Sequence, residues 1–235
     1  MTLPVKALLF DVFGTLVDWR TGVAREAERI LKPRGHAIDA PAFADAWRAE
    51  YQPAMDEVRA GRIGYCKLDV LHWRNLERIL PRFGIAGLDE AVLHDLTLAW
   101  HRLDAWPDVP SGLERLRQKF LLAPVSNGNI SLMVDLARRN RLPWDAVLGA
   151  EIARDYKPKP AVYLASCAAF DLAPADCMMV AAHTGDLLAA AQCGLRGAHI
   201  ARPNEHGPGR GEAAPSAPVD IAAQDLLDLA ARLST

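Results

Sequence analysis

The sequence has few of the features that mark metal-binding, membrane or secreted proteins. Its four cysteines, Cys66, Cys167, Cys177 and Cys193, include no C-x-x-C pair of the kind that holds zinc or forms a redox couple. We therefore expect reduced, mostly buried thiols in a cytoplasmic protein. No stretch of about eighteen residues is purely apolar, and the first residues lack the apolar run of a signal peptide. A membrane partner is therefore not expected.

The charged residues are balanced in sign. Lys and Arg number 27 and Asp and Glu number 29, and no basic stripe offers a surface for nucleic acid, so we expect no such partner. Hydrophobic residues make up 51% of the 235 residues, which is enough to bury a full core. The length predicts one large domain or a core with an inserted subdomain.

Short apolar runs recur along the chain and predict a parallel β-sheet. The first, Val5–Phe10, ends abruptly at Asp11, as central strands buried on both faces do. Similar runs follow at residues 120–125, 146–150, 177–182 and 197–201. Helical patterns at residues 111–119 and 160–170 precede two of these runs. This alternation is typical of a doubly wound α/β fold with a Rossmann-like sheet.

The region between residues 17 and 100 breaks this alternation. It contains no convincing strand, and its helical segments lie at residues 23–31, 42–58 and 68–80. Because it follows the first strand directly, we expect an inserted helical cap over the carboxyl ends of the strands. The prediction is a cap of residues 17–100 and a catalytic core of residues 1–16 and 101–235.

The C-terminal part of the chain combines a loop with a helix. Residues 202–218 are rich in Gly, Pro and Ala and predict a mobile loop. A final helix is expected near residues 220–233.

Polar side chains follow the predicted strands at the points where these end. They form four clusters: Asp11 with Thr15, Ser126 with Asn127, Lys157 alone, and His183 with Asp186. Open α/β sheets bind ligands beyond the carboxyl ends of their strands, so the four clusters together indicate a site. Each cluster also has a structural alternative, since Asp11 could cap a helix, Ser126 could belong to a turn, and Lys157 could be a solvated loop residue.

Three motifs resemble those of the haloacid dehalogenase superfamily. They are FDVFGTLVD around Asp11, PVSNGN around Ser126 and YKPKPAVY around Lys157. Their order and spacing match over essentially the whole chain, with the helical insertion in the expected place.

Most members of this superfamily are phosphatases, and the sequence departs from their pattern twice. Phosphatases carry a second Asp two residues after the nucleophile, where this chain has Phe13, which cannot transfer a proton. They also hold Mg²⁺ with an acidic pair, where residues 180–186 offer only Asp186. A phosphatase is disfavoured but stays open, as do a non-catalytic binding protein and a hydrolase of another activated small molecule.

What remains resembles the L-2-haloacid dehalogenases, the type II group. The resemblance implies that Asp11 attacks the carbon bearing the halogen, with inversion at C2, and that water hydrolyses the resulting ester. A carboxylate suits this role because it is anionic without a separate base. The implied partners are a small anionic 2-haloacid and the halide product, with no metal or cofactor, and the family implies a homodimer.

The resemblance also assigns supporting catalytic roles. Lys157 would keep Asp11 ionised and help to hold the substrate carboxylate. Thr15 would orient Asp11, and Asp186 would position Lys157 or the hydrolytic water. His183 stands where better-known members have the Asn that helps place that water, so it is either a base or a hydrogen-bonding substitute.

A second set of residues is expected to contact the substrate. These are Val12, Phe13, Trp47, Arg48, Ser126, Asn127 and Tyr163. Arg48 matches the arginine on the halide side, with Asn127 as its companion. Ser126 and the backbone amides from Val12 on would bind the substrate carboxylate, and Phe13 and Trp47 would exclude water. Ala181 replaces a family Ser that helps to place the hydrolytic water. Gly185 replaces a bulky aromatic residue, which predicts a more open pocket.

Overall fold

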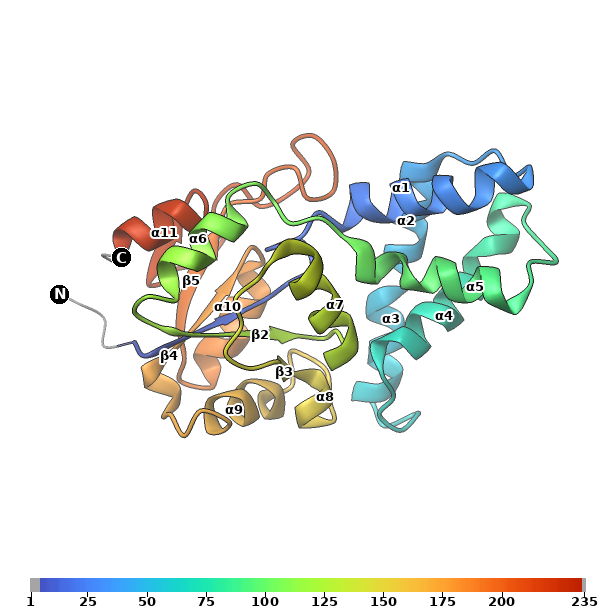
Figure 1. Ribbon diagram of the computed structural model, residues 1–235. Helices are drawn as coiled ribbons and strands as arrows, with labels where there is room; N and C mark the ends of the chain where they lie inside the picture. The colour runs from blue at the N-terminus through green and yellow to red at the C-terminus, as the bar shows by residue number, and fades with distance from the viewer. Residues whose placement is uncertain (1–4, 234–235) are drawn as a thin grey trace.

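The computed structural model describes residues 5–233, so the ends of the predicted core, residues 1–4 and 234–235, lie outside the described residues. It contains a six-stranded parallel sheet in the order β3-β2-β1-β4-β5-β6 (Figure 1). The strands are β1 (Ala7–Phe10), β2 (Leu121–Ser126), β3 (Leu148–Gly149), β4 (Cys177–Ala181), β5 (Arg196–Ile200) and β6 (Ile221–Ala223). The doubly wound parallel sheet predicted from the apolar runs is confirmed.

Strand β1 lies in the middle of the sheet and is buried along its whole length. It pairs with β2 on one side and β4 on the other, with Phe10 aligned to Pro124 and Val180. All three strands run in the same direction, so the residues that follow them meet at one edge of the sheet. Asp11 is therefore placed at the centre of that edge.

Helices cover both faces of the sheet through two separate apolar clusters. One face packs against α6 (Val109–Leu116), α7 (Ile130–Asn140) and α11 (Leu226–Arg232). The other packs against α9 (Pro160–Ala168) and α10 (Thr184–Gln192), with the short α8 (Ala150–Ala153) beside α9. These layers cover the apolar sheet and leave its carboxyl edge open to the site.

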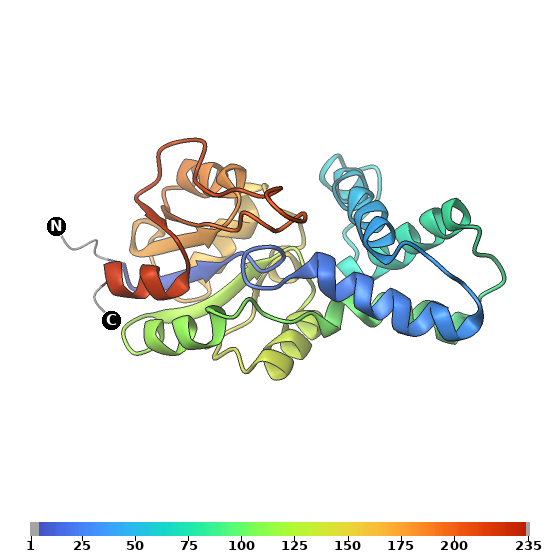
Figure 2. The same cartoon turned by 90° about the horizontal axis from the view of Figure 1, so that it is seen from above.

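The cap is a group of helices set against that edge. It consists of α1 (Trp19–Leu31), α2 (Ala40–Ala49), α3 (Tyr51–Arg59), α4 (Leu68–Ile79) and α5 (Glu90–Thr97). Figures 1 and 2 show these helices together at the end of the molecule toward which the strands point. Three of them begin at an aspartate whose side chain accepts a backbone N–H of the first turn, namely Asp18, Asp39 and Asp89.

Two details differ from the prediction. The helix expected at residues 42–58 is two helices that meet at Glu50, which is both the C-cap of α2 and the N-cap of α3. The helix expected near residues 220–233 begins only at Leu226, because β6 comes before it and pairs in parallel with β5. Within the described residues, none of the helices is long and apolar enough to cross a membrane.

Candidate functional site

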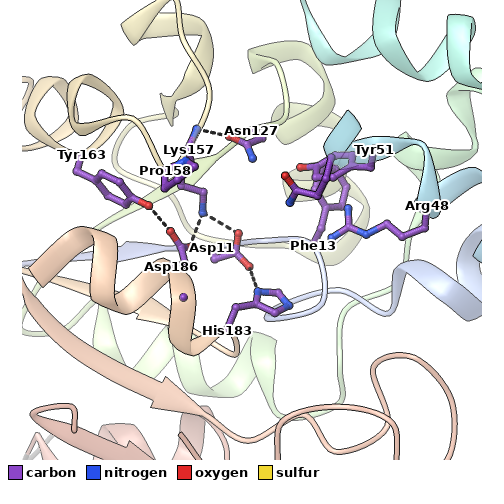
Figure 3. A pocket seen from close by; sticks show the side chains of 12 residues that line it. Asp11, Phe13, Arg48, Tyr51, Asn127, Lys157, Pro158, Tyr163, His183 and Asp186 are labelled. Carbon is purple, nitrogen blue, oxygen red and sulfur yellow. Dashed lines mark hydrogen bonds and ion pairs between the residues drawn. The ribbon is translucent and has the colours of Figure 1, made fainter. Parts of the chain in front are cut away.

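A cavity of about 400 Å³ lies between the cap and the carboxyl ends of the strands (Figure 3). Eight residues predicted for the site line it: Asp11, Phe13, Arg48, Asn127, Lys157, Tyr163, His183 and Asp186. Four others complete the lining: Tyr51, Gln52, Pro158 and Gly185. The residues come from the cap helices and from the segments that follow β1, β2, β3 and β4, so the fold brings together residues that are far apart in the sequence.

The Asp11 carboxylate is the centre of the site. Its Oδ2 accepts a hydrogen bond from Thr15 Oγ1 at 2.7 Å and lies 3.3 Å from His183 Nδ1. Its Oδ1 accepts from Lys157 Nζ at 2.9 Å. Thr15 is itself fixed, because its hydroxyl accepts the backbone N–H of Ala182 at 2.9 Å. The carboxylate therefore has one orientation, set by three neighbours.

Lys157 is held by groups from three elements. Its ammonium donates to Asp186 Oδ2 at 2.6 Å as well as to Asp11, and its backbone N–H donates to Asn127 Oδ1 at 2.8 Å. The Tyr163 hydroxyl donates to the other oxygen of Asp186. Asp186 thus contacts both Lys157 and Tyr163.

These contacts determine the charge of Asp11. Burial alone would raise the pKa of the Asp11 carboxyl, but the Lys157 ammonium and the His183 ring together lower it well below its usual range. Burial would lower the pKa of Lys157, and Asp11 and Asp186 raise it above its usual value. At neutral pH the site holds an ionised carboxylate beside a protonated amine.

His183 connects Asp11 to a second buried carboxylate. Its Nε2 lies 2.8 Å from Glu205 Oε2, and Glu205 is only 2% exposed. Trp19 of the cap fixes Glu205 by donating its indole N–H to Oε1 at 3.0 Å. Gly14 leaves room for this arrangement, since a Cβ there would lie 2.1 Å from the same oxygen. His183 is therefore held between two carboxylates.

The charge of His183 depends on both of these neighbours. Burial would lower its pKa, but the hydrogen bonds and charges of Asp11 and Glu205 raise it to about 10. Glu205 has a lowered pKa: burial opposes this shift, and the His183 ring causes it. With Asp11 ionised, His183 is an imidazolium. It loses one of its two stabilising partners if Asp11 becomes uncharged.

Arg48 reaches the cavity from the cap. Its guanidinium lies over the ring of Tyr51 at 4.0 Å and that of Trp19 at 5.2 Å. Among the described residues its Nη1 is buried and has no hydrogen-bond partner. In Figure 3, Asp186 and Tyr163 lie on one side of Asp11 and Arg48 on the other. A buried donor without a partner, facing a cavity, is suited to binding an anion.

Phe13 forms an apolar wall of the same cavity. It packs edge-on against Tyr51 of α3, His72 of α4 and Trp100, with ring centroids 5.7 Å to 6.4 Å away. Burial lowers the pKa of His72 to about 3, so this ring is neutral. The Phe13 side chain itself carries no proton to donate.

Four predicted residues lie outside the cavity lining. Thr15 donates its hydroxyl to Asp11 but does not line the cavity, and Val12 is buried. Ser126 is buried with its Oγ accepting the N–H of Gly128 at 3.0 Å, which leaves its own hydrogen free to donate. Trp47 does not reach the cavity, because its indole donates to the His72 carbonyl and its ring packs on Trp100. The substrate contacts of Val12, Ser126 and Trp47 stay predictions.

Sequence reasoning missed Tyr51, Gln52 and Glu205. Tyr51 follows Arg48 by three residues, a spacing that could have suggested a shared side across the α2–α3 junction. Glu205 lies in the loop predicted from residues 202–218, and no local pattern distinguishes it. That loop is confirmed, and Arg202 anchors it through a bidentate pair with Asp108 at 2.8 Å.

Within residues 5–233, no group of three or more His, Cys, Asp or Glu side chains is placed to hold a metal ion. The charged group nearest to the Asp11 carboxylate is the Lys157 ammonium, which bridges Asp11 and Asp186.

The chain is similar to proteins of known activity over nearly its whole length. The sequence profile of the haloacid dehalogenase-like hydrolases matches residues 5–194. The (S)-2-haloacid dehalogenase 1 of Pseudomonas sp. (strain CBS-3) is 29% identical over 207 residues, covering 86% of this chain and 87% of the relative. The crystal structure of a defluorinating L-2-haloacid dehalogenase has a TM-score of 0.96 at 44% identity, covering 98% of this chain and 96% of that chain. A second L-2-haloacid dehalogenase structure has a TM-score of 0.93 at 45% identity, with 98% and 99% covered.

Proposed function

Because the chain belongs to the haloacid dehalogenase-like hydrolases, and within them to the L-2-haloacid dehalogenases, we propose that it hydrolyses short 2-haloacids to 2-hydroxyacids. The reaction passes through a covalent ester on Asp11. One observation carries the proposal: an ionised, oriented Asp11 carboxylate faces the same cavity as an Arg48 donor that has no partner among the described residues.

In the first half of the reaction an Asp11 oxygen forms a bond to C2 and the carbon–halogen bond breaks. The halide leaves with the bonding electrons toward Arg48, whose Nη1 supplies the missing partner for an anion. Lys157 and the Ser126 hydroxyl hold the substrate carboxylate. A halide needs no proton to leave, so the reaction does not require the acid that a phosphatase has at the position of Phe13.

In the second half, water attacks the carbonyl carbon of the ester. The ester no longer carries the charge that raised the pKa of His183, so the imidazolium releases its proton to solvent and becomes a base. It takes a proton from the attacking water while Glu205 stabilises the new imidazolium across their 2.8 Å contact. His183 then gives this proton to the departing 2-hydroxyacid oxygen. The second proton of the water passes from Asp11 to His183, so that a carboxylate again lies beside an imidazolium.

Phosphate chemistry fits this site poorly. A phosphate dianion beside Asp11 needs compensating positive charge, but the Lys157 ammonium is already shared by Asp11 and Asp186. The His183 imidazolium is likewise shared by Asp11 and Glu205, which leaves Arg48. Phe13 stands where a phosphatase has the acid for its leaving alcohol, and its side chain has no proton to donate. The halogen-bearing substrate is the S enantiomer, as in the names of the relatives, with inversion at C2.

We also propose that the protein acts in the cytoplasm and as a homodimer. The four cysteines are free thiols, which suits the reducing cytoplasm. The family resemblance also leads us to expect a homodimer. Light scattering after gel filtration measures the mass of the assembly and tests this expectation.

The test is halide release from each enantiomer of 2-chloropropionate, in the presence of EDTA, by wild type and by Asp11→Asn. We expect release from the S enantiomer by wild type alone, unchanged by EDTA. Loss of activity on chelation would show a metal requirement. Sustained turnover by Asp11→Asn, with the Asn verified by mass spectrometry to exclude deamidation, would remove Asp11 as nucleophile.

A further inference from the structure

A second hollow adjoins the catalytic cavity. It has a volume of about 650 Å³ and lies between α3 and its C-terminal end on the cap and the segment after Lys157 on the core. Gln52 and Pro158 line both spaces, so the two lie side by side. We call this space the mouth groove.

The mouth groove has a surplus of positive charge. Among its lining residues are three cations, Arg59, Arg62 and Lys159, and one carboxylate, Asp56. Arg59 neutralises Asp56, with its Nη2 2.8 Å from Asp56 Oδ1, and also donates to Gln52 Oε1 and to the Lys157 carbonyl. Two cationic charges therefore remain uncompensated within the groove.

Those two charges belong to Arg62 and Lys159. Both residues are exposed, and within residues 5–233 neither side chain has a hydrogen bond or an ion-pair partner. One comes from the cap and the other from the core, so they approach the groove from its two sides. Uncompensated cations beside a cavity attract anions and raise their local concentration.

We propose that the mouth groove binds a second carboxylate of the substrate, so that 2-halodicarboxylates of the 2-halosuccinate class are substrates. This inference rests on the proposed function, because the halogen-bearing carbon and its own carboxylate occupy the catalytic cavity. The distal carboxylate then extends past Gln52 and Pro158 toward Arg62 and Lys159. A purely alkyl tail in the same place would desolvate charged groups without pairing them.

The test compares (S)-2-chlorosuccinate with (S)-2-chloropropionate in wild type and in Arg62→Gln/Lys159→Gln. We expect kcat/KM for chlorosuccinate to fall about tenfold in the double variant, because two exposed ion pairs are lost, with less than about a twofold change for chloropropionate. The chlorosuccinate advantage of wild type also falls with added salt. The matched control Arg138→Gln/Arg141→Gln removes two exposed cations outside the groove and leaves both substrates unchanged.

A second arm separates this inference from the proposed function. Binding of succinate and of propionate is measured by calorimetry on Asp11→Asn, with and without the two groove substitutions. Tighter binding of succinate that disappears with Arg62 and Lys159 supports the groove even if no halide is released from any substrate. Equal effects on mono- and dicarboxylates, or none on either, overturn the inference while leaving chloropropionate turnover intact.

Discussion

Replacing Glu205 with Gln separates the two halves of the proposed reaction. The substitution keeps the shape of the side chain, and the amide can still contact Trp19, but it removes the negative charge 2.8 Å from His183 Nε2. Attack by Asp11 on the substrate does not use this charge. Ester hydrolysis does, because His183 must become an imidazolium as it accepts a proton from water.

The magnitude follows from the contact that is lost. A hydrogen bond between charged groups contributes about 1.5–3 kcal/mol, which corresponds to about 10- to 150-fold in the rate of ester hydrolysis. The single-turnover rate of halide release should change less than threefold. Hydrolysis then limits kcat, and the ester accumulates.

Rapid quench followed by mass spectrometry measures both rates. We expect a burst of one halide per active site, and a tryptic peptide containing Asp11 that carries the mass of the acyl group. Glu212→Gln is the matched control, because Glu212 lies in the same loop but contacts Thr184 and His199. The reasoning is refuted if Glu205→Gln slows the burst itself, or if kcat falls with no ester on Asp11.

Two further predictions concern the surroundings of Asp11, and a third concerns the stability of the fold. Arg48→Gln removes the guanidinium whose Nη1 lacks a partner among the described residues, so the single-turnover rate of halide release should fall by about 10²-fold. No ester should accumulate, which is the opposite of the result expected for Glu205→Gln. Lys157→Gln removes a cation that lowers the pKa of Asp11, so the acid limb of the kcat/KM profile should move to higher pH, and an unmoved limb would contradict the assignment. His101 lies 2.7 Å from Asp135 and 3.1 Å from Asp69; burial opposes its protonation, but these carboxylates raise its pKa. Its protonated form should therefore stabilise the fold fully below about pH 6.5 and lose that effect as pH rises through the raised pKa. The difference in free energy of unfolding between wild type and His101→Asn, measured in urea, should be larger at pH 5.5 than at pH 9.

Much of the fold could be predicted because it depends on local patterns. A buried central strand such as β1 is a continuous apolar run, and such runs were placed to within a few residues. The split between α2 and α3 was missed because apolar residues continue across Glu50 on the buried side, so periodicity alone does not reveal the change of direction. Strand β6 was missed because three residues at a sheet edge leave no period to detect.

The site residues also divide into those that local sequence patterns predict and those that they do not. Asp11, Lys157 and Asp186 could be predicted because each follows a strand in a recognisable motif. Glu205 could not, because its position depends on tertiary contacts: the anchoring of its loop by Arg202, the indole of Trp19 and the space left at Gly14. The pairing of His183 with Glu205 therefore becomes visible only in three dimensions. Whether His183 is a base or a hydrogen-bonding substitute stays a prediction, which Glu205→Gln tests.

The central claim is that Asp11 forms an ester whose carbonyl carbon water attacks. Its most direct test is a single turnover of (S)-2-chloropropionate by excess enzyme in H₂¹⁸O. The ester mechanism predicts that the lactate hydroxyl carries ¹⁶O from Asp11, while one ¹⁸O appears in the Asp11 peptide. Lactate labelled with ¹⁸O in that first turnover, with an unlabelled Asp11, would contradict the account, because water would then have attacked C2 directly.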